Sequence, residues 1–231
     1  MVRFAALVSV LVLASPTADA KCAMQHLAPK VLTDGPIATG GGFVVAEVDG
    51  ADDARDSVSA AQPTWTLAAG GTKAAPKLVT LAPGLVVYRV EKAGETSLVD
   101  GTTVLATATA GAPAGRTLPA PKVNAIRHEK TLGRRASAFT RVTLAEPPPD
   151  GALALVLTDA NGKARSFGLV DEDDLSVITV YAHSRCGVVP NNTVESSAGQ
   201  RVKLFWVDRS GRSSPTSKLV TIAGKINDQG D

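Results

Sequence analysis

Apolar side chains recur at every second position over residues 202–207, near the C-terminus. This period of two predicts a β-strand. Asp208 and Gly211 then supply a turn, because Asp accepts hydrogen bonds from the backbone two residues on and Gly takes a positive φ at little cost. Residues 218–222 are apolar again and form the predicted returning strand. The stretch therefore predicts a β-hairpin.

The same pattern occurs 49 residues earlier in the chain. Residues 155–163 (LVLTDANGK) match residues 204–212 (LFWVDRSGR) as an apolar strand, an Asp, two further residues, a Gly and a basic residue. In both copies we expect the Asp to open a type I turn and the Gly to take the left-handed position that closes it. Such spacing also occurs in solenoid and propeller repeats. Because no third copy is present, two hairpins of one sandwich are the simpler prediction.

Other predicted strands are apolar runs separated by Gly, Pro, Asn and Asp, the residues that punctuate strands. In the first half they are residues 40–48, 64–68, 77–81, 85–90 and 102–108. In the second half they are residues 122–127, 138–144, 153–158, 165–169, 175–182, 202–207 and 218–222. No window has a sustained helical period. Residues 21–36 are expected to be an irregular entry segment.

Seven short strands separated by turns, as in the second half, are the pattern of an immunoglobulin-like sandwich. Trp206 is expected to anchor its core. The chain is therefore predicted to be all-β, with two immunoglobulin-like antiparallel β-sandwich domains in tandem. The expected parts are a signal peptide (1–20), an N-terminal β-sandwich-like domain (21–112), a Pro/Gly linker (113–120), an immunoglobulin- or fibronectin III-like domain (121–224) and a polar tail (225–231).

Residues 199–222, GQRVKLFWVDRSGRSSPTSKLVTI, resemble the final hairpin of bacterial fibronectin type III and immunoglobulin-like modules. The likeness is looser over residues 119–224. The first half resembles other extracytoplasmic β-sandwich domains only in a glycine turn and the strand after it. The resemblance implies a fold and no particular function, because these sandwiches host many unrelated roles.

The N-terminus predicts export. Arg3 is followed by an apolar run over residues 4–14 and by Ala18-Asp19-Ala20, the pattern of a cleaved signal peptide. The run is shorter than the roughly 20 residues that span a bilayer, which favours a cleaved signal over a membrane anchor. No second apolar run follows it, so we expect no transmembrane segment in the mature chain. The net charge of +2 gives no electrostatic reason to expect nucleic acid. The expected location is the periplasm, the cell surface or the extracellular space.

The two cysteines, Cys22 and Cys186, would then lie in an oxidising compartment. Such a pair predicts a disulfide, which would tie the mature N-terminus to the C-terminal domain. The bridge would also bring together His26 and His183. With Met24 these histidines form a candidate copper or zinc site. A disulfide would withdraw both thiolates from that site, leaving two imidazoles and a thioether.

No catalytic constellation is recognised in the sequence, and no catalytic residue is assigned. His128-Glu129 begins like the zinc-protease motif HExxH, but Leu132 replaces the second histidine and the segment is predicted as strand rather than helix. No GxSxG elbow is present. The acidic runs 49–56 and 171–174 lack the spacing of a calcium loop and are interpreted as solvated turns. A further alternative is a hydrolase, for instance one that acts on cell-wall polymer. It would require a cleft lined by carboxylates or aromatics.

The sequence therefore predicts an exported, non-enzymatic β-sandwich protein without a cofactor, with a structural or protein-binding role at the cell envelope. The alternative is a periplasmic copper- or zinc-binding protein that uses His26, His183 and Met24. The expected partner is a protein or another component of the cell envelope. No pattern assigns the binding residues or the oligomeric state.

Overall fold

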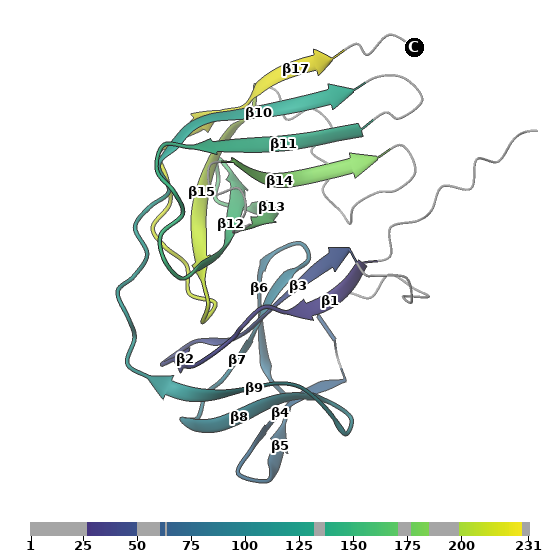
Figure 1. The fold of residues 1–231 in the computed structure, drawn as a ribbon, viewed down its shortest axis with the longest axis vertical. Helices are drawn as coiled ribbons and strands as arrows, with labels where there is room; N and C mark the ends of the chain where they lie inside the picture. The colour runs from purple at the N-terminus through teal and green to yellow at the C-terminus, as the bar shows by residue number, and fades with distance from the viewer. Residues whose placement is uncertain are drawn as a thin grey trace, which may run out of the picture.

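The computed structural model describes residues 27–49, 61–62, 64–131, 137–170, 177–184 and 199–227. Every regular element among them is a β-strand (Figure 1). The bounds are β1 (Leu27–Val31), β2 (Ile37–Ala38), β3 (Gly42–Asp49), β4 (Trp65–Ala69), β5 (Thr72–Ala74), β6 (Lys77–Ala82), β7 (Leu85–Arg89), β8 (Gly94–Asp100), β9 (Thr103–Ala112), β10 (Val123–Thr131), β11 (Ser137–Leu144), β12 (Ala152–Asp159), β13 (Ala164–Leu169), β14 (Val177–Ser184), β15 (Arg201–Asp208), β16 (Val220–Thr221) and β17 (Ala223–Asn227). Within these ranges no helix is long and apolar enough to cross a membrane.

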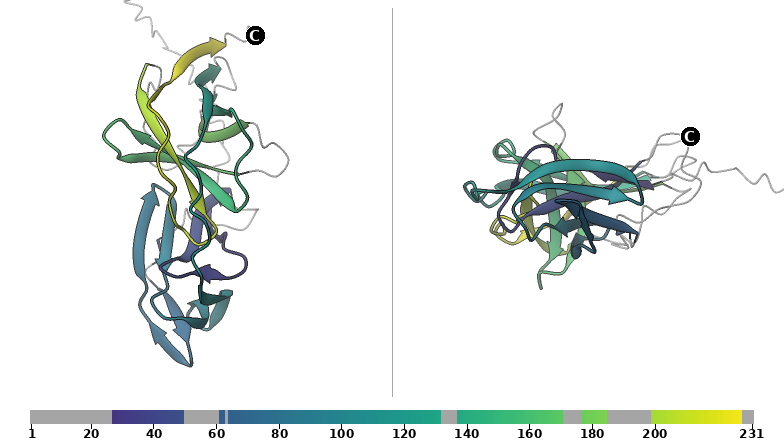
Figure 2. Two further views of the ribbon diagram at one scale, coloured as in Figure 1. Left: turned by 90° about the vertical axis from the view of Figure 1, so that its left-hand side faces the viewer. Right: turned by 90° about the horizontal axis from the view of Figure 1, so that it is seen from below.

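The strands form four sheets, which we number in the order in which they pack. Sheet I is β2-β9-β8-β4-β5 and sheet II is β1-β3-β7-β6, both from the N-terminal half. Sheet III is β13-β12-β15-β16 and sheet IV is β14-β11-β10-β17, both from the C-terminal half. Figure 1 and the left view of Figure 2 show the two halves end to end, with the N-terminal half below.

The strand order of the N-terminal half is that of the immunoglobulin fold, in which one sheet is A-B-E-D and the other contains C-F-G. The C-terminal half has the A-B-E neighbours β10, β11 and β14 in sheet IV, with β17 beside β10 and no D strand among the described residues. Sheet II has the A-B-E-D order, and the neighbours β4, β8 and β9 of sheet I occupy C, F and G. In the C-terminal half, β12, β15 and β16 occupy the same three positions. The predicted immunoglobulin-like β-sandwich fold is confirmed. Two pairs, β2 with β9 and β10 with β17, are parallel, so the sheets are not purely antiparallel.

Each half has its own core between its two sheets. In the N-terminal half, Phe43 and Tyr88 of sheet II pack with Trp65 and Leu98 of sheet I. The rings of Trp65 and Tyr88 lie 5.6 Å apart. In the C-terminal half, Trp206 is 2% exposed and belongs to the core between sheets III and IV. The prediction that Trp206 anchors a core is therefore confirmed.

A third core joins the two halves. Successive side chains of a strand point to opposite faces of its sheet, and sheets II and III use both faces. The faces that turn away from the two inner cores pack together through the following residues: Val44, Ala46, Ala82, Leu85, Val87, Ala154, Val156 and Val207. Strands that are buried on both faces are expected to have nearly continuous apolar sequences. This is the case for β3, β7, β12 and β15.

Five strands, β1, β2, β5, β8 and β17, have no predicted counterpart. Residues 21–36 were expected to be irregular, and this is wrong for 27–31, where Pro29 argues against a strand. β1 accommodates Pro29 because it is an edge strand. The first residues of β8 are polar, yet β8 pairs on both sides with β4 and β9. β17 extends to Asn227, so the beginning of the expected polar tail is a strand.

Candidate functional site between the two sandwiches

Two turns of the C-terminal half share one hydrogen-bond pattern. In the first, Asp159 Oδ1 accepts the backbone N–H groups of Asn161 and Lys163, both at 2.9 Å. Gly162, with a φ of 85°, donates its N–H to the Asp159 carbonyl at 3.0 Å. Arg165 Nη2 lies 2.7 Å from Asp159 Oδ2. The predicted roles of Asp and Gly in this turn are confirmed.

These contacts change the acidity of the first turn's carboxylate. The backbone N–H of Lys163 has the largest effect and lowers the pKa of Asp159 below its ordinary value, with further lowering from Arg165 and Asn161. A hydrogen bond to the charged form of a carboxylate favours that form. Asp159 is therefore held as a carboxylate by the turn that it closes.

The second turn repeats the pattern with Asp208. Its Oδ1 accepts the N–H groups of Ser210 and Arg212, both at 2.9 Å, and Arg212 Nε lies 2.7 Å from Oδ2. Gly211 has a φ of 72° and donates its N–H to the Asp208 carbonyl at 2.8 Å. The difference between the two turns is in what surrounds them, because the second turn is buried against the N-terminal half.

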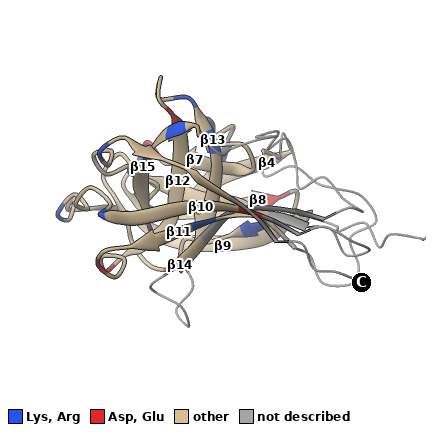
Figure 3. Cartoon of the chain, turned by 90° about the horizontal axis from the view of Figure 1, so that it is seen from above, with Lys and Arg blue, Asp and Glu red and all other residues tan. Residues whose placement is uncertain are grey.

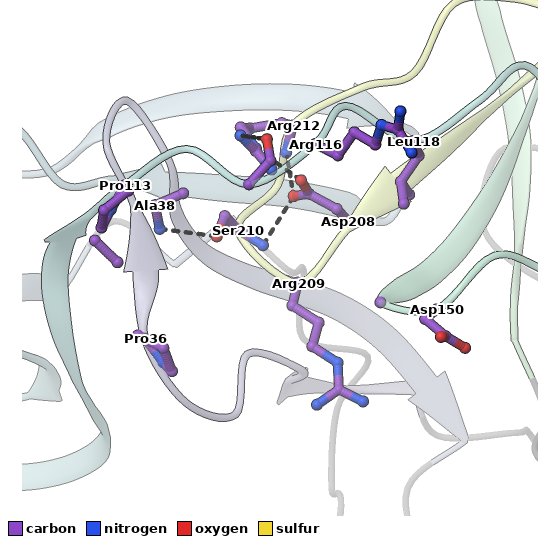
Figure 4. Close-up of a pocket in the computed structure, with 13 residues that line it drawn as sticks. Pro36, Ala38, Pro113, Arg116, Leu118, Asp150, Asp208, Arg209, Ser210 and Arg212 are labelled. Atoms are coloured by element: carbon purple, nitrogen blue, oxygen red, sulfur yellow. Dashed lines mark hydrogen bonds and ion pairs between the residues drawn. The ribbon is translucent and has the colours of Figure 1, made fainter.

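Hydrogen bonds tie the second turn to the N-terminal half. Ser210 Oγ accepts the N–H of Ala38 at 2.9 Å, and the Ser210 carbonyl accepts the N–H of Gly42 at 2.9 Å. The hydroxyl of Thr33 donates to the Arg209 carbonyl at 3.1 Å. Figure 4 shows Ser210 pointing toward Ala38, whereas Arg209 extends away from the turn. These bonds satisfy polar groups that the contact between the halves buries.

The backbones approach so closely here that side chains would not fit. A Cβ on Gly211 would lie 2.6 Å from Val87 Cγ2, and a Cβ on Gly41 would lie 2.7 Å from the Ser210 carbonyl oxygen. Glycine is needed at position 211 for a second reason, since its φ is in the left-handed region. The glycine that closes the turn thus also permits the halves to pack.

The chain leaves this turn through a segment that contains Pro215. Its serines replace part of the regular ladder: Ser214 Oγ accepts the N–H of Trp206 at 2.9 Å, and Ser217 Oγ accepts that of Leu204 at 3.0 Å. The regular pairing of β16 with β15 is confined to Arg201↔Thr221 and Val202↔Val220. The predicted hairpin is present, but its returning strand is short and β17 continues into sheet IV.

A pocket of about 240 Å³ lies beside the second turn. Its lining, shown in Figure 4, includes Arg116 and Leu118 of the segment that connects the halves, Asp150, and the turn residues Asp208 and Arg212. Arg212 also donates to the Gly115 carbonyl at 3.3 Å. Ligand pockets usually have about 300–1,000 Å³, and no histidine lines this one. The arrangement positions the two halves and offers no nucleophile paired with a base.

Most sequence-predicted site residues lie outside the described residues, namely Cys22, Met24, His26 and Cys186. His183 belongs to β14, where its backbone pairs with Ala138. The structure therefore does not test the predicted disulfide or the candidate metal site. The described part of the chain contains no group of three or more His, Cys, Asp and Glu that could hold a metal ion.

The remaining predicted features have mixed outcomes. His128 lies in β10, with Nδ1 3.1 Å from Thr140 Oγ1, so the predicted strand at this position is confirmed. The acidic run 171–174 lies outside the described residues, as do residues 50–56. The docking of the 208–212 turn was not predicted. The Asp and Gly that predict this turn also occur in the 159–163 turn, which does not pack against the N-terminal half.

Comparisons with known proteins yield no family. No family model matches the sequence, and no curated protein matches it. Among solved structures, the BSP domain of a biofilm-associated protein is 14% identical, with 86% of this chain and 29% of that chain covered and a TM-score of 0.28. The FN1-FN3 domains of chicken CNTN1 are 11% identical, with 87% and 67% covered and a TM-score of 0.28.

A third similar structure is the adhesin InvE of Yersinia pseudotuberculosis, 14% identical, with 86% of this chain and 60% of that chain covered and a TM-score of 0.19. The match spans about 29% of the chain in that BSP domain structure. At such identities and scores the likenesses carry no functional argument. The fold-level resemblance to immunoglobulin-like and fibronectin III-like sandwiches is shown, and the strand order given above is its physical basis.

Proposed function

We propose that the chain is an exported, non-enzymatic protein in which two sandwiches form one stiff unit with a structural or protein-binding role at the cell envelope. The observation that carries this proposal is the third core. Val44, Val87, Val156 and Val207 are fully buried between the halves. Domains of one chain usually move relative to each other unless their interface is large and hydrophobic, and this interface is hydrophobic.

The second turn adds hydrogen bonds, which are directional, to that apolar contact. Hydrogen bonds through Ser210 and Thr33 are satisfied in one relative placement of the halves. Sliding the halves would leave a buried N–H or carbonyl without a partner, at a cost of about 1–3 kcal/mol for each group. A unit fixed in this way presents its outer faces and loops at constant spacing, which suits a structural or binding role.

The export part of the proposal rests on the N-terminal signal pattern. The Cys22–Cys186 disulfide would add a covalent tie between the halves. Intact mass with a thiol count on the exported protein tests this disulfide. Free thiols with stoichiometric copper or zinc would instead favour the metal-binding alternative.

Photo-crosslinking in cells tests the binding role. A tagged full-length chain carries a photoreactive residue at one exposed position, Leu78 in sheet II, Val104 in sheet I or Ala223 in sheet IV. We expect a chain that has lost residues 1–20, that fractionates with the envelope, and that forms a discrete crosslink from at least one face. Untagged protein should compete with that crosslink. A cytoplasmic chain that keeps residues 1–20, or one that crosslinks from none of the three positions, would contradict the proposal.

A further inference from the structure

Two arginines lie directly opposite each other on the outer face of sheet IV. Arg127 of β10 pairs with Arg141 of β11 in the antiparallel ladder. Their neighbours Ile126 and Val142 are buried in the core, so by alternation both arginines face away from it. Both are exposed. Directly opposed residues have Cβ atoms roughly 5 Å apart, and like charges in that position destabilise a sheet.

Nothing described neutralises this pair. Arg127 and Arg141 make no ion pair with any described residue, including Glu129 on the same face of β10. The other described ion pairs involve cations elsewhere, for example Lys122 with Glu146. Figure 3 views the chain from above and shows a basic stretch beside the labels of β10 and β11.

The Arg141 guanidinium is also held in place. Its Cζ lies 4.7 Å from the centre of the Phe139 ring, over the ring face. Such a contact favours the cation electrostatically and reduces the freedom of a long side chain. An ordered guanidinium loses less conformational entropy when it binds a ligand. The face therefore presents two adjacent cationic forks, one of them oriented in advance.

We propose that the outer face of sheet IV, centred on Arg127 and Arg141, is the docking surface for an acidic protein segment. The planar guanidinium matches a carboxylate through two parallel hydrogen bonds. Arginine and aromatic residues are the types enriched where proteins bind proteins. This inference rests on the proposed protein-binding role and names the partner's chemistry.

The described face favours an acidic protein over a phosphate polymer. Tight binding of polyphosphate-like chains comes from many cations that each displace a counterion, typically about 6–10 contacts. By register this face carries three cations, Arg127, Arg141 and Lys225. It carries one carboxylate, Glu129, whose backbone pairs with Lys225. Two forks suit a local pair of Asp or Glu side chains, which carry their carboxylates at a spacing of one or two residues.

Binding of two labelled probes to the mature protein tests the proposal by fluorescence anisotropy at about 0.05 and 0.15 M salt. The probes are poly-L-glutamate and inorganic polyphosphate. The variant R127Q/R141Q should weaken poly-L-glutamate binding about tenfold or more, the equivalent of about 1.4 kcal/mol or more. The control K77Q/K92Q removes the same charge from exposed positions of the other half and should change the affinity less than about twofold.

Melting temperature separates binding from a structural role. R127Q/R141Q should melt at the same temperature or higher, because a repulsive pair is removed. Equal weakening in both variants, a lower melting temperature with unchanged binding, or binding of polyphosphate alone would overturn the proposal. In cells, a crosslink from Ala223 that persists in R127Q/R141Q would overturn it while the protein-binding role stands. Absence of crosslinks from every face would reject that role itself.

Discussion

The hydroxyl of Ser210 accepts the backbone N–H of Ala38 at 2.9 Å, across the boundary between the two sandwiches. Both residues are buried. Ser210 reaches this place because the Asp208 carboxylate closes the turn around it, through the N–H groups of Ser210 and Arg212. A local turn motif thus supplies a long-range polar contact inside an otherwise apolar interface.

Replacing Ser210 by Ala should destabilise the protein by about 1–3 kcal/mol, because the Ala38 N–H stays buried and loses its acceptor. The substitution keeps Cβ and introduces no clash. Urea unfolding at pH 7 measures the loss. Ser97→Ala is the matched control: it removes an exposed hydroxyl bond to Thr107 and should change stability by less than about 0.5 kcal/mol. Equal effects of the two substitutions would show that the Ser210 bond does not secure the interface.

The two turn glycines provide a comparison within one chain. Gly162→Ala and Gly211→Ala both place a side chain at positive φ, which costs roughly 1–2 kcal/mol. At position 162 the new Cβ meets nothing within 4 Å, whereas at 211 it would lie 2.6 Å from Val87 Cγ2. Gly211→Ala should therefore cost more by about 1–3 kcal/mol, the range for overpacking. Denaturation midpoints of the pair measure this difference, and similar midpoints would argue against close packing of the halves.

Each half contains one tryptophan, Trp65 in the N-terminal core and Trp206 in the C-terminal core. The variants Trp65→Phe and Trp206→Phe therefore each report one half by fluorescence. Because the third core couples the halves, the fluorescence transition of each variant should coincide with its own transition by far-UV circular dichroism. Comparing two probes within one variant removes the effect of the substitution on stability. Two separated transitions would mean that the halves unfold independently.

Local chemistry explains which features could be predicted from the sequence. The Asp159 and Asp208 turns were predictable because every contact that defines them lies within five residues. The inner cores followed from alternation along strands such as β15. The third core did not, because Val87 and Val156 were visible only as parts of apolar runs. The third core depends on how the two sandwiches are placed relative to each other. No local sequence pattern encodes that placement.

The candidate sites were harder to predict from the sequence than the fold. The sequence drew attention to rare residues, the cysteines and histidines, and these lie mostly outside the described ranges. The opposed pair Arg127 and Arg141 is formed by common residues 14 positions apart. It becomes notable only through the register of β10 and β11. A strand prediction without register cannot place two side chains opposite each other.

The stability of the first turn should depend on pH through Asp159. Its pKa is lowered in the folded protein, so its stabilising contribution is present above the unfolded value of about 3.9 and is lost as pH falls through the lower folded value. Asp159→Asn keeps an acceptor oxygen for the turn but removes the charge that binds Arg165. The variant should therefore be less stable than the wild type at pH 7, and the difference should shrink below about pH 4.

Urea midpoints of wild type and Asp159→Asn at pH 7, 5, 4 and about 3 measure this dependence. Asp150→Asn is the control, because the Asp150 side chain is exposed and makes no hydrogen bond or ion pair with a described residue. Other carboxylates also lose charge in acid, so only the difference between each variant and the wild type is informative. A difference for Asp159→Asn that stays constant with pH would show that the charge of Asp159 contributes nothing and that the turn is held by its neutral hydrogen bonds alone.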